Sequence, residues 1–103
     1  MIVSFGFRFG HPIGGVIIDA RVLRNPFRQK KLRYKTGLNQ EVIRDVQGTP
    51  GFGETYQKWL ERATNQPRVF VGCHSGHHRS VVVAEMLAKD LGDRVYHRDI
   101  NRS

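Results

Sequence analysis

The chain has 103 residues, enough for one domain with one modest core, and its 39% hydrophobic and 25% charged residues are typical of a water-soluble globular protein. No apolar run approaches the length of a membrane span, and the start MIVSFGFRFG argues against a secretory signal. The single cysteine, Cys73, excludes an internal disulfide, and a lone thiol favours the cytoplasm.

Strands and helices are expected to alternate along the chain. Four segments rich in β-forming residues are predicted strands: 2–7, 16–21, 68–72 and 94–100. Three segments are predicted helices: 40–47, 54–64, and a third from Arg79 or Ser80 to Leu91, with Gly92 as its C-terminal cap. Run 68–72 has no polar alternation, which is typical of a central strand covered on both faces. The pattern predicts a single α/β domain, 1–103, with a mostly parallel sheet and no internal repeat.

A long basic connection, 25–39, separates the second strand from the first helix. Lysine and arginine outnumber aspartate and glutamate by 17 to 9, for a formal net charge of +8. The excess is concentrated between residues 21 and 44, where Glu41 is the only acid. The basic residues of this stretch are Arg21, Arg24, Arg28, Lys30, Lys31, Arg33, Lys35 and Arg44. Such a patch predicts salt-sensitive binding to RNA or DNA, and the alternative is a solvated loop that keeps the protein soluble.

The stretch VFVGCHSGHHRSVVVAEML, residues 69–87, places a glycine-containing loop between a buried strand and a helix. This geometry favours anions, because the first N–H groups of the helix have no intrahelical partner and the helix dipole adds positive charge there. Glycines allow the backbone to turn sharply, and Arg79 offers a planar fork that matches phosphate. The predicted phosphate site comprises Gly72, Cys73, His74, Ser75, Gly76, His77, His78, Arg79 and Ser80. The alternative is a tight strand-to-helix turn with Arg79 exposed.

Cysteine-dependent cleavage of phosphate esters is one chemistry that this loop could support. Cys73 and Arg79 have the C-x5-R spacing of protein tyrosine phosphatases, followed by Ser80, and a helix N-terminus would lower the pKa of the thiol. Gly72, however, stands where those phosphatases usually have histidine. The general acid would come from elsewhere, and Asp19 is the best candidate if its strand neighbours strand 68–72.

Two other chemistries compete with it. Cys73, His74, His77 and His78 are potential zinc ligands, but four ligands within six residues cannot easily reach one tetrahedral ion, so no metal is expected. Phosphate recognition without turnover uses the same backbone and Arg79, and makes Cys73 a small buried packing residue. No cofactor is expected in any of these cases.

A resemblance to a known family covers nearly the whole chain. The segments SFGFRFGHPI, DARVLRNPF, LRYKTGLN, GCHSGHHRSVVVAEMLA and VYHRDI occur in the order found in the C-terminal domain of the bacterial RNase adapter protein RapZ. The chain therefore resembles that domain standing alone, since it lacks the Walker A motif of the family's N-terminal domain. The resemblance is far more specific than C-x5-R.

The resemblance implies an α/β unit that binds the phosphosugar glucosamine-6-phosphate and small RNA, and that contacts a ribonuclease; it leaves a homo-oligomer open. The family's GCTGGxHRS loop falls on residues 72–80, with His78 and Arg79 at its ligand-binding centre. Asp19 and Arg21 match the family's Asp-x-Arg, expected to face the same pocket, and Arg8 matches a basic position linked to RNA. The RNA-binding residues expected are Arg8, Arg24, Arg28, Lys30, Lys31, Arg33 and Lys35.

The chain departs from the family pattern at several positions. His74 and Ser75 replace the usual Thr-Gly, Phe27 stands where some members have histidine, and Asn39 replaces an aspartate. The segment between Asn39 and Pro67 is shorter than in the long members. The sequence thus predicts a regulatory module that binds a phosphorylated small molecule and has a basic surface for RNA, with the phosphatase as its rival.

Overall fold

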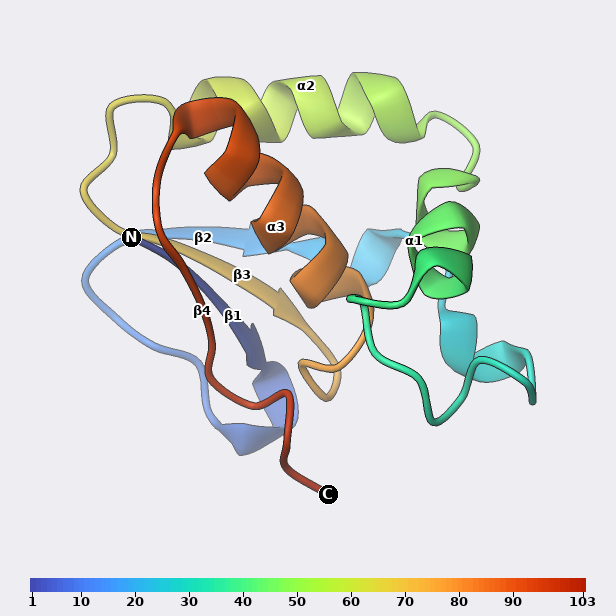
Figure 1. Cartoon of the computed structure of the whole chain (residues 1–103). Helices are drawn as coiled ribbons and strands as arrows, with labels where there is room; N and C mark the ends of the chain where they lie inside the picture. The colour runs from blue at the N-terminus through green and yellow to red at the C-terminus, as the bar shows by residue number, and fades with distance from the viewer.

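A four-stranded parallel sheet forms the centre of the structure, a computed structural model that describes residues 1–103. Its strands are β1 (Ile2–Gly6), β2 (Val16–Asp19), β3 (Val69–Cys73) and β4 (Val95–His97), in the order β2-β3-β1-β4. Every pair of neighbouring strands is parallel, which confirms the predicted α/β class (Figure 1). All five residues of β3 are buried, as expected for a central strand.

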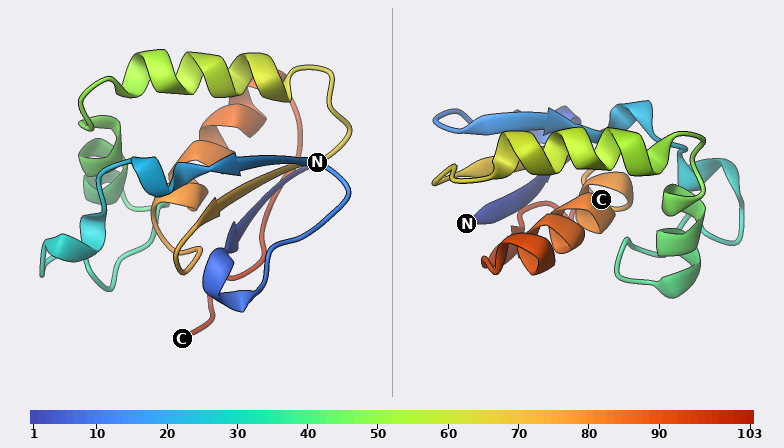
Figure 2. Two further views of the ribbon diagram at one scale, coloured as in Figure 1. Left: turned by 180° about the vertical axis from the view of Figure 1, so that it is seen from behind. Right: turned by 90° about the horizontal axis from the view of Figure 1, so that it is seen from above.

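Three helices pack around this sheet: α1 (Gln40–Gln47), α2 (Phe52–Ala63) and α3 (Arg79–Leu91). Helix α3 crosses one face of the sheet, and the view from behind shows no helix over the opposite face (Figure 2). The core of 18 buried residues joins the strands to the helices. Tyr56, Trp59 and Ala63 of α2 belong to this core and form the apolar face of that helix. No helix is long and apolar enough to cross a membrane.

The ends of the helices follow local rules. The side chain of Asn39 accepts hydrogen bonds from the N–H groups of Glu41 and Val42 and so caps the start of α1. Gly92 ends α3 with φ of 63°, as predicted. Helix α2 begins two residues before the predicted start, because Phe52 is buried and its ring stacks on Tyr56 with 6.0 Å between ring centres.

Three predicted strands are longer than the observed ones. Segment 16–21 stops being a strand at Asp19, because the Asp19 carboxylate accepts the N–H of Arg21 and starts a 3₁₀ turn. Segment 94–100 pairs only over β4, since the chain then turns so that the buried Asp99 can accept the N–H of Gly6 at 2.8 Å. Segment 2–7 ends at Gly6 and is followed by a 3₁₀ turn.

The topology places one point of the sheet where a ligand site is expected. The carboxyl ends of β1 and β3 lie side by side, with Gly6 paired to Cys73. The chain leaves β1 for β2 on one side of this pair, and leaves β3 through α3 for β4 on the other side. Parallel α/β sheets bind ligands at such a divergence, outside the carboxyl ends of the strands.

Candidate anion-binding site

A pocket of about 710 Å³ lies at this carboxyl end. Its walls come from Arg8 after β1, from parts of segment 25–36, from the loop between β3 and α3, and from residues 100–103. The basic side chains of its lining belong to Arg8, Arg33, Lys35, Arg79 and Arg102, whereas no aspartate or glutamate side chain lines it. The pocket is therefore electrically suited to an anion.

The backbone of the anion loop, residues 73–79, contains several N–H groups without a backbone partner. The carbonyl of His74 accepts from Arg8 N–H at 3.1 Å, and that of His77 accepts from Gly37 N–H at 2.8 Å. The N–H groups of residues 74–78, by contrast, donate to no backbone carbonyl. Gly76 has φ of 75°, and His78, the N-cap residue of α3, makes no side-chain cap hydrogen bond. Successive open N–H groups at the start of a helix form a site for phosphate.

Arg79 and His78 add buried donors without full sets of partners. Both residues are only 7% exposed. The Nη1 of Arg79 donates to the carbonyls of Arg21 at 2.9 Å and Leu23 at 3.3 Å, which fixes the guanidinium, while its Nε has no partner. The Nε2 atoms of His77 and His78 are also buried without partners. Since buried polar groups are nearly always paired, these three atoms indicate a place for a polar partner.

Burial affects the protonation of this cluster. Loss of solvation lowers the pKa of His78, opposed by the backbone carbonyls of Lys35 and Arg33. Burial also lowers the pKa of Arg79, opposed by Cys73 and Asp19, but a guanidinium remains charged at neutral pH. An anion that enters the pocket thus meets a fixed cation and a neutral imidazole that its own charge would help to protonate.

Asp19 and Arg21 lie behind the pocket rather than in its lining. Asp19 Oδ1 accepts from Arg21 Nε at 2.9 Å, and its Oδ2 accepts from Arg21 Nη2 at 2.7 Å. The hydrogen bond from Arg21 holds the pKa of Asp19 below its ordinary value. β2 does pair with β3, with Asp19 opposite Gly72, as the sequence analysis required of this candidate. The link from this pair to the pocket is indirect, through the Arg21 carbonyl that holds Arg79.

The cysteine forms part of the pocket, while the serine beside it does not. Cys73 is 3% exposed and lines the pocket, and its thiol is 3.1 Å from the hydroxyl of Ser80. Ser80 itself is fully buried and outside the lining. His74 and Ser75 line the pocket as predicted neighbours of the anion loop. No three His, Cys, Asp or Glu side chains lie together as they would to hold a metal ion.

Gly72 and Gly76 lie against β1 with no room for a side chain. A Cβ on Gly72 would lie 2.5 Å from the ring of Phe5, and one on Gly76 would lie 2.7 Å from the N atom of Gly6. Neither glycine lines the pocket. Both allow the strand and loop to pack closely against β1.

In the folded structure, acidic side chains pair with several of the basic residues between 21 and 44. Asp45 accepts from Arg28 at 2.8 Å and lies 4.0 Å from Arg24, although it follows the stretch in sequence. Glu41 pairs with Lys35 at 2.8 Å and with Lys31 at 3.6 Å. Lys30 is exposed and forms no ion pair. Arg8, Arg33 and Lys35 line the pocket, whereas Arg24 and Lys31 line a second, shallower groove beside Asp45.

Sequence reasoning missed two walls of the pocket. One contains Asn25, Phe27, Tyr34 and Thr36, and the other is the C-terminal segment 100–103. The turn glycine Gly37 was a signal for the first wall, since a Cβ there would lie 2.5 Å from the His78 carbonyl oxygen and the segment must press against the anion loop. No local pattern marks the second wall.

Comparison with known proteins identifies the family of the chain. Residues 1–101 match the family described as the RapZ C-terminal domain. The chain is 40% identical to a nucleotide-binding protein of Corynebacterium efficiens, covering 99% of this chain and 38% of the relative. It is 36% identical to one of Pseudomonas fluorescens and 33% identical to one of Pediococcus pentosaceus, covering 98% of this chain in both cases. It spans 41% and 40% of those two relatives. The chain belongs to the RapZ C-terminal domain family.

Proposed function

We propose that this domain is a regulatory module that binds the phosphate group of a phosphorylated sugar in the pocket above the anion loop. The observations that carry the proposal are the buried polar atoms without partners, which are Arg79 Nε and the Nε2 atoms of His77 and His78, and the loop N–H groups that donate to no backbone carbonyl. A phosphate monoester offers enough oxygen acceptors to pair with several of them. The buried cation of Arg79 favours its charge.

The lining also bears on which sugar binds. Glucosamine 6-phosphate carries an ammonium group, yet no aspartate or glutamate side chain lines the pocket to pair with it. The phosphate therefore dominates recognition. We expect glucose 6-phosphate and glucosamine 6-phosphate to bind with affinities within about tenfold of one another, since each 1.4 kcal/mol is tenfold.

The test is a thermal-shift panel of inorganic phosphate, sulfate, glucose 6-phosphate, glucosamine 6-phosphate and the unphosphorylated sugars. A ligand at 100 times its dissociation constant adds about 2.7 kcal/mol, which raises the melting temperature of a small domain by roughly 10 °C or more. Arg79→Ala should abolish the shift. Arg94→Ala, which removes an exposed arginine outside the pocket, is the matched control and should retain it. A flat panel with the wild-type protein would refute the phosphate site.

RNA binding is the second part of the proposed role, supported by the net charge of +8. Lys30 carries no ion pair, whereas Arg28 is paired with Asp45. Lys30→Ala should therefore reduce RNA affinity and the salt slope by about one phosphate contact, and Arg28→Ala should have the smaller effect. Equal losses from the two substitutions would mean that the Asp45 pair opens when RNA binds.

One observation favours a second candidate function, a cysteine-dependent phosphatase. The Cys73 thiol is 3.1 Å from Ser80 Oγ, and a hydroxyl there would stabilise a thiolate facing phosphorus in the anion loop. The proposed general acid, however, is ion-paired: Asp19 is held by Arg21 and lies outside the pocket. Binding without turnover fits this arrangement better. Phosphate release from p-nitrophenyl phosphate that disappears in Cys73→Ser would reverse the preference.

A further inference from the structure

Two exposed aromatic rings border the pocket. Tyr34 is 90% exposed and Phe27 is 51% exposed, and both line the pocket that contains the anion loop. Only one other exposed aromatic residue occurs in the chain, Tyr96 on the edge strand β4, and it lies outside the pocket. Exposed rings concentrated at one cavity indicate a contact surface, because isolated surface aromatics gain little from water.

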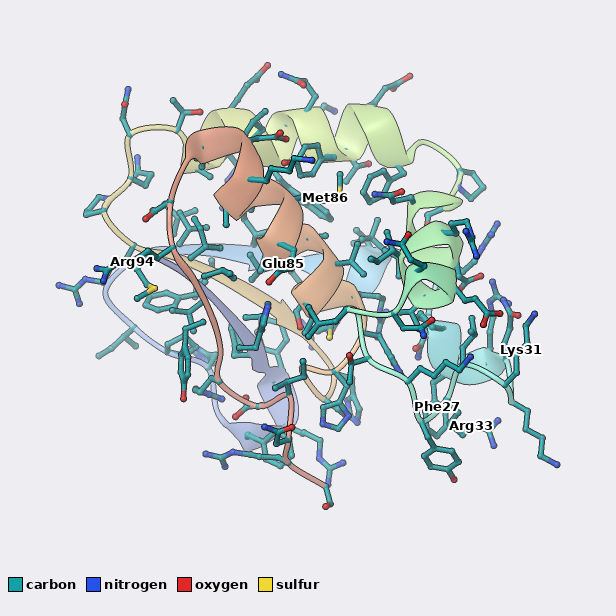
Figure 3. All side chains as sticks on the ribbon, viewed as in Figure 1. Phe27, Lys31, Arg33, Glu85, Met86 and Arg94 are labelled. Carbon is teal, nitrogen blue, oxygen red and sulfur yellow. The ribbon has the colours of Figure 1, made fainter.

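An arginine side chain lies against one of these rings. The Arg33 guanidinium lies 4.6 Å from the centre of the Phe27 ring, and both side chains extend from the outer loop beside the pocket (Figure 3). Arg33 Nε also donates to the Phe27 carbonyl at 3.1 Å, so the ring and the guanidinium form one unit. Flat aromatic and guanidinium surfaces beside positive charge are the usual platforms on which nucleobases stack.

The platform is held at a fixed place relative to the anion loop. Gly37 N–H donates to the His77 carbonyl at 2.8 Å, three residues after Tyr34. The carbonyls of Arg33 and Lys35 face the His78 imidazole. At the other end of the segment, Phe27 N–H donates to the Asn25 side chain at 3.1 Å. The two rings thus belong to a segment that is hydrogen-bonded to the anion loop and that lines the same pocket.

We infer that the pocket takes a nucleoside monophosphate unit, with its phosphate on the anion loop and its base against Phe27 and Tyr34. The inference rests on the proposed phosphate site and adds the base as the second half of the ligand. A cavity of about 710 Å³ falls within the range of about 300–1,000 Å³ that suits ligands of this size. A free mononucleotide and the phosphorylated end of an RNA strand both present this unit.

The experiment is an isothermal titration of the wild-type protein with ribose 5-phosphate, AMP and adenosine. Stacking of one base is worth about fivefold to a hundredfold in affinity, so AMP should bind more tightly than ribose 5-phosphate by that factor. Tyr34→Ala and Phe27→Ala should bring AMP to the level of ribose 5-phosphate and leave ribose 5-phosphate unchanged. Tyr34→Phe should retain AMP binding, because stacking needs the ring and not the hydroxyl.

Tyr96→Ala is the matched control, since it removes an exposed tyrosine away from the pocket, and it should change neither titration. A second arm compares a short RNA with a 5′-phosphate against the same RNA with a 5′-hydroxyl. A preference for the phosphorylated strand that requires Arg79 assigns the unit to an RNA end, and AMP binding without that preference assigns it to a free nucleotide.

Two results would overturn the inference in distinguishable ways. If AMP and ribose 5-phosphate bind equally and Tyr34→Ala changes neither, the base platform is refuted while the phosphate site stands. If no phosphorylated compound binds to the wild-type protein, both the phosphate site and the inference fail.

Discussion

The anion loop and the C-terminal turn, residues 97–102, lie next to one another and treat polar groups in opposite ways. In the C-terminal turn the buried carboxylate of Asp99 accepts from Gly6 N–H at 2.8 Å, from Arg98 at 2.7 Å and from Arg102 at 3.0 Å. In the anion loop, Arg79 Nε and two histidine nitrogens are buried with no partner at all. A satisfied cluster stabilises the fold, whereas an unsatisfied one is retained where a ligand completes it.

The two regions also touch. A Cβ on Gly76 would lie 3.1 Å from the Asp99 Cβ, and both regions contact the end of β1 at Gly6. The C-terminal turn therefore packs against the anion loop, and its residues 100–102 also line the pocket. This difference predicts that substitution of Asp99 in the turn acts on stability and that substitution of Arg79 in the loop acts on binding.

The largest effect is expected from Asp99→Ala. The side chain is fully buried, and its removal leaves the Gly6 N–H unpaired and two arginines without their carboxylate. We expect the free energy of unfolding to fall by about 3–5 kcal/mol in urea denaturation. Asp93→Ala is the control, because Asp93 forms an exposed ion pair with the N-terminus and should cost less than about 1 kcal/mol. Similar losses for both variants would refute the structural role of the turn.

Gly76→Ala is expected to cause the second-largest loss of stability. The residue has φ of 75°, and its new Cβ would lie 2.7 Å from Gly6 N, so left-handed strain adds to a clash with backbone. Together these cost about 3 kcal/mol. Gly92→Ala separates the two causes, because Gly92 has φ of 63° and nothing within 4 Å, and should cost about 1 kcal/mol. Equal melting temperatures for the two variants would show that the anion loop shifts to accommodate the added Cβ at little cost in stability.

A smaller effect concerns pH. Because burial lowers the pKa of His78 in the folded state, the unfolded chain takes up this proton at a higher pH than the folded chain. The stability that neutral His78 contributes is complete above about pH 6.5 and declines as the pH falls below that value. His78→Gln should remove this part of the decline. Bound phosphate should reduce it as well, since an anion favours the protonated ring, and a decline unaffected by either change would contradict the assignment.

The smallest effect is expected from Glu85→Gln. His97 lies between Ser4 Oγ and Glu85 Oε2, at 2.6 Å from each, and ties β4 to β1 and α3. Because the Glu85 side chain is 43% exposed, water replaces much of what the carboxylate provides. The loss in urea denaturation should stay below about 1 kcal/mol. A loss near that of Asp99→Ala would mean that the edge strand, and not the turn, secures the C-terminal segment.

The sequence predicted the helices better than the strand ends. The predicted helix 40–47 coincides with α1, and Gly92 marked the end of α3. The ends of β2 and β4 depend instead on carboxylates, since Asp19 captures the N–H of Arg21 and Asp99 captures that of Gly6. The second of these joins residues far apart in the chain, and spacing rules contain no information on such a pair.

The candidate site also has one part that could be predicted from the sequence and another that could not. The anion loop could be predicted because strand, glycine, helix start and Arg79 are contiguous in sequence. The walls with Tyr34 and with residues 100–103 could not, because the fold brings them there through Gly37 and Asp99. The charge count between residues 21 and 44 also overestimated the unpaired positive charge. Asp45 lies one residue beyond that stretch and pairs with Arg28.

The order of the strands in the sheet has a consequence for how the molecule reaches its fold. Every strand pair is parallel, and only β2 and β3 are both successive in sequence and neighbours: Ile2 pairs with Val69 and Val95, and Val16 pairs with Val69. No hairpin can therefore start the sheet, and every ladder closes a long loop before it gains a hydrogen bond. Folding should be slow for a domain of this length, and β1 should remain unpaired on the ribosome until residue 69 has emerged.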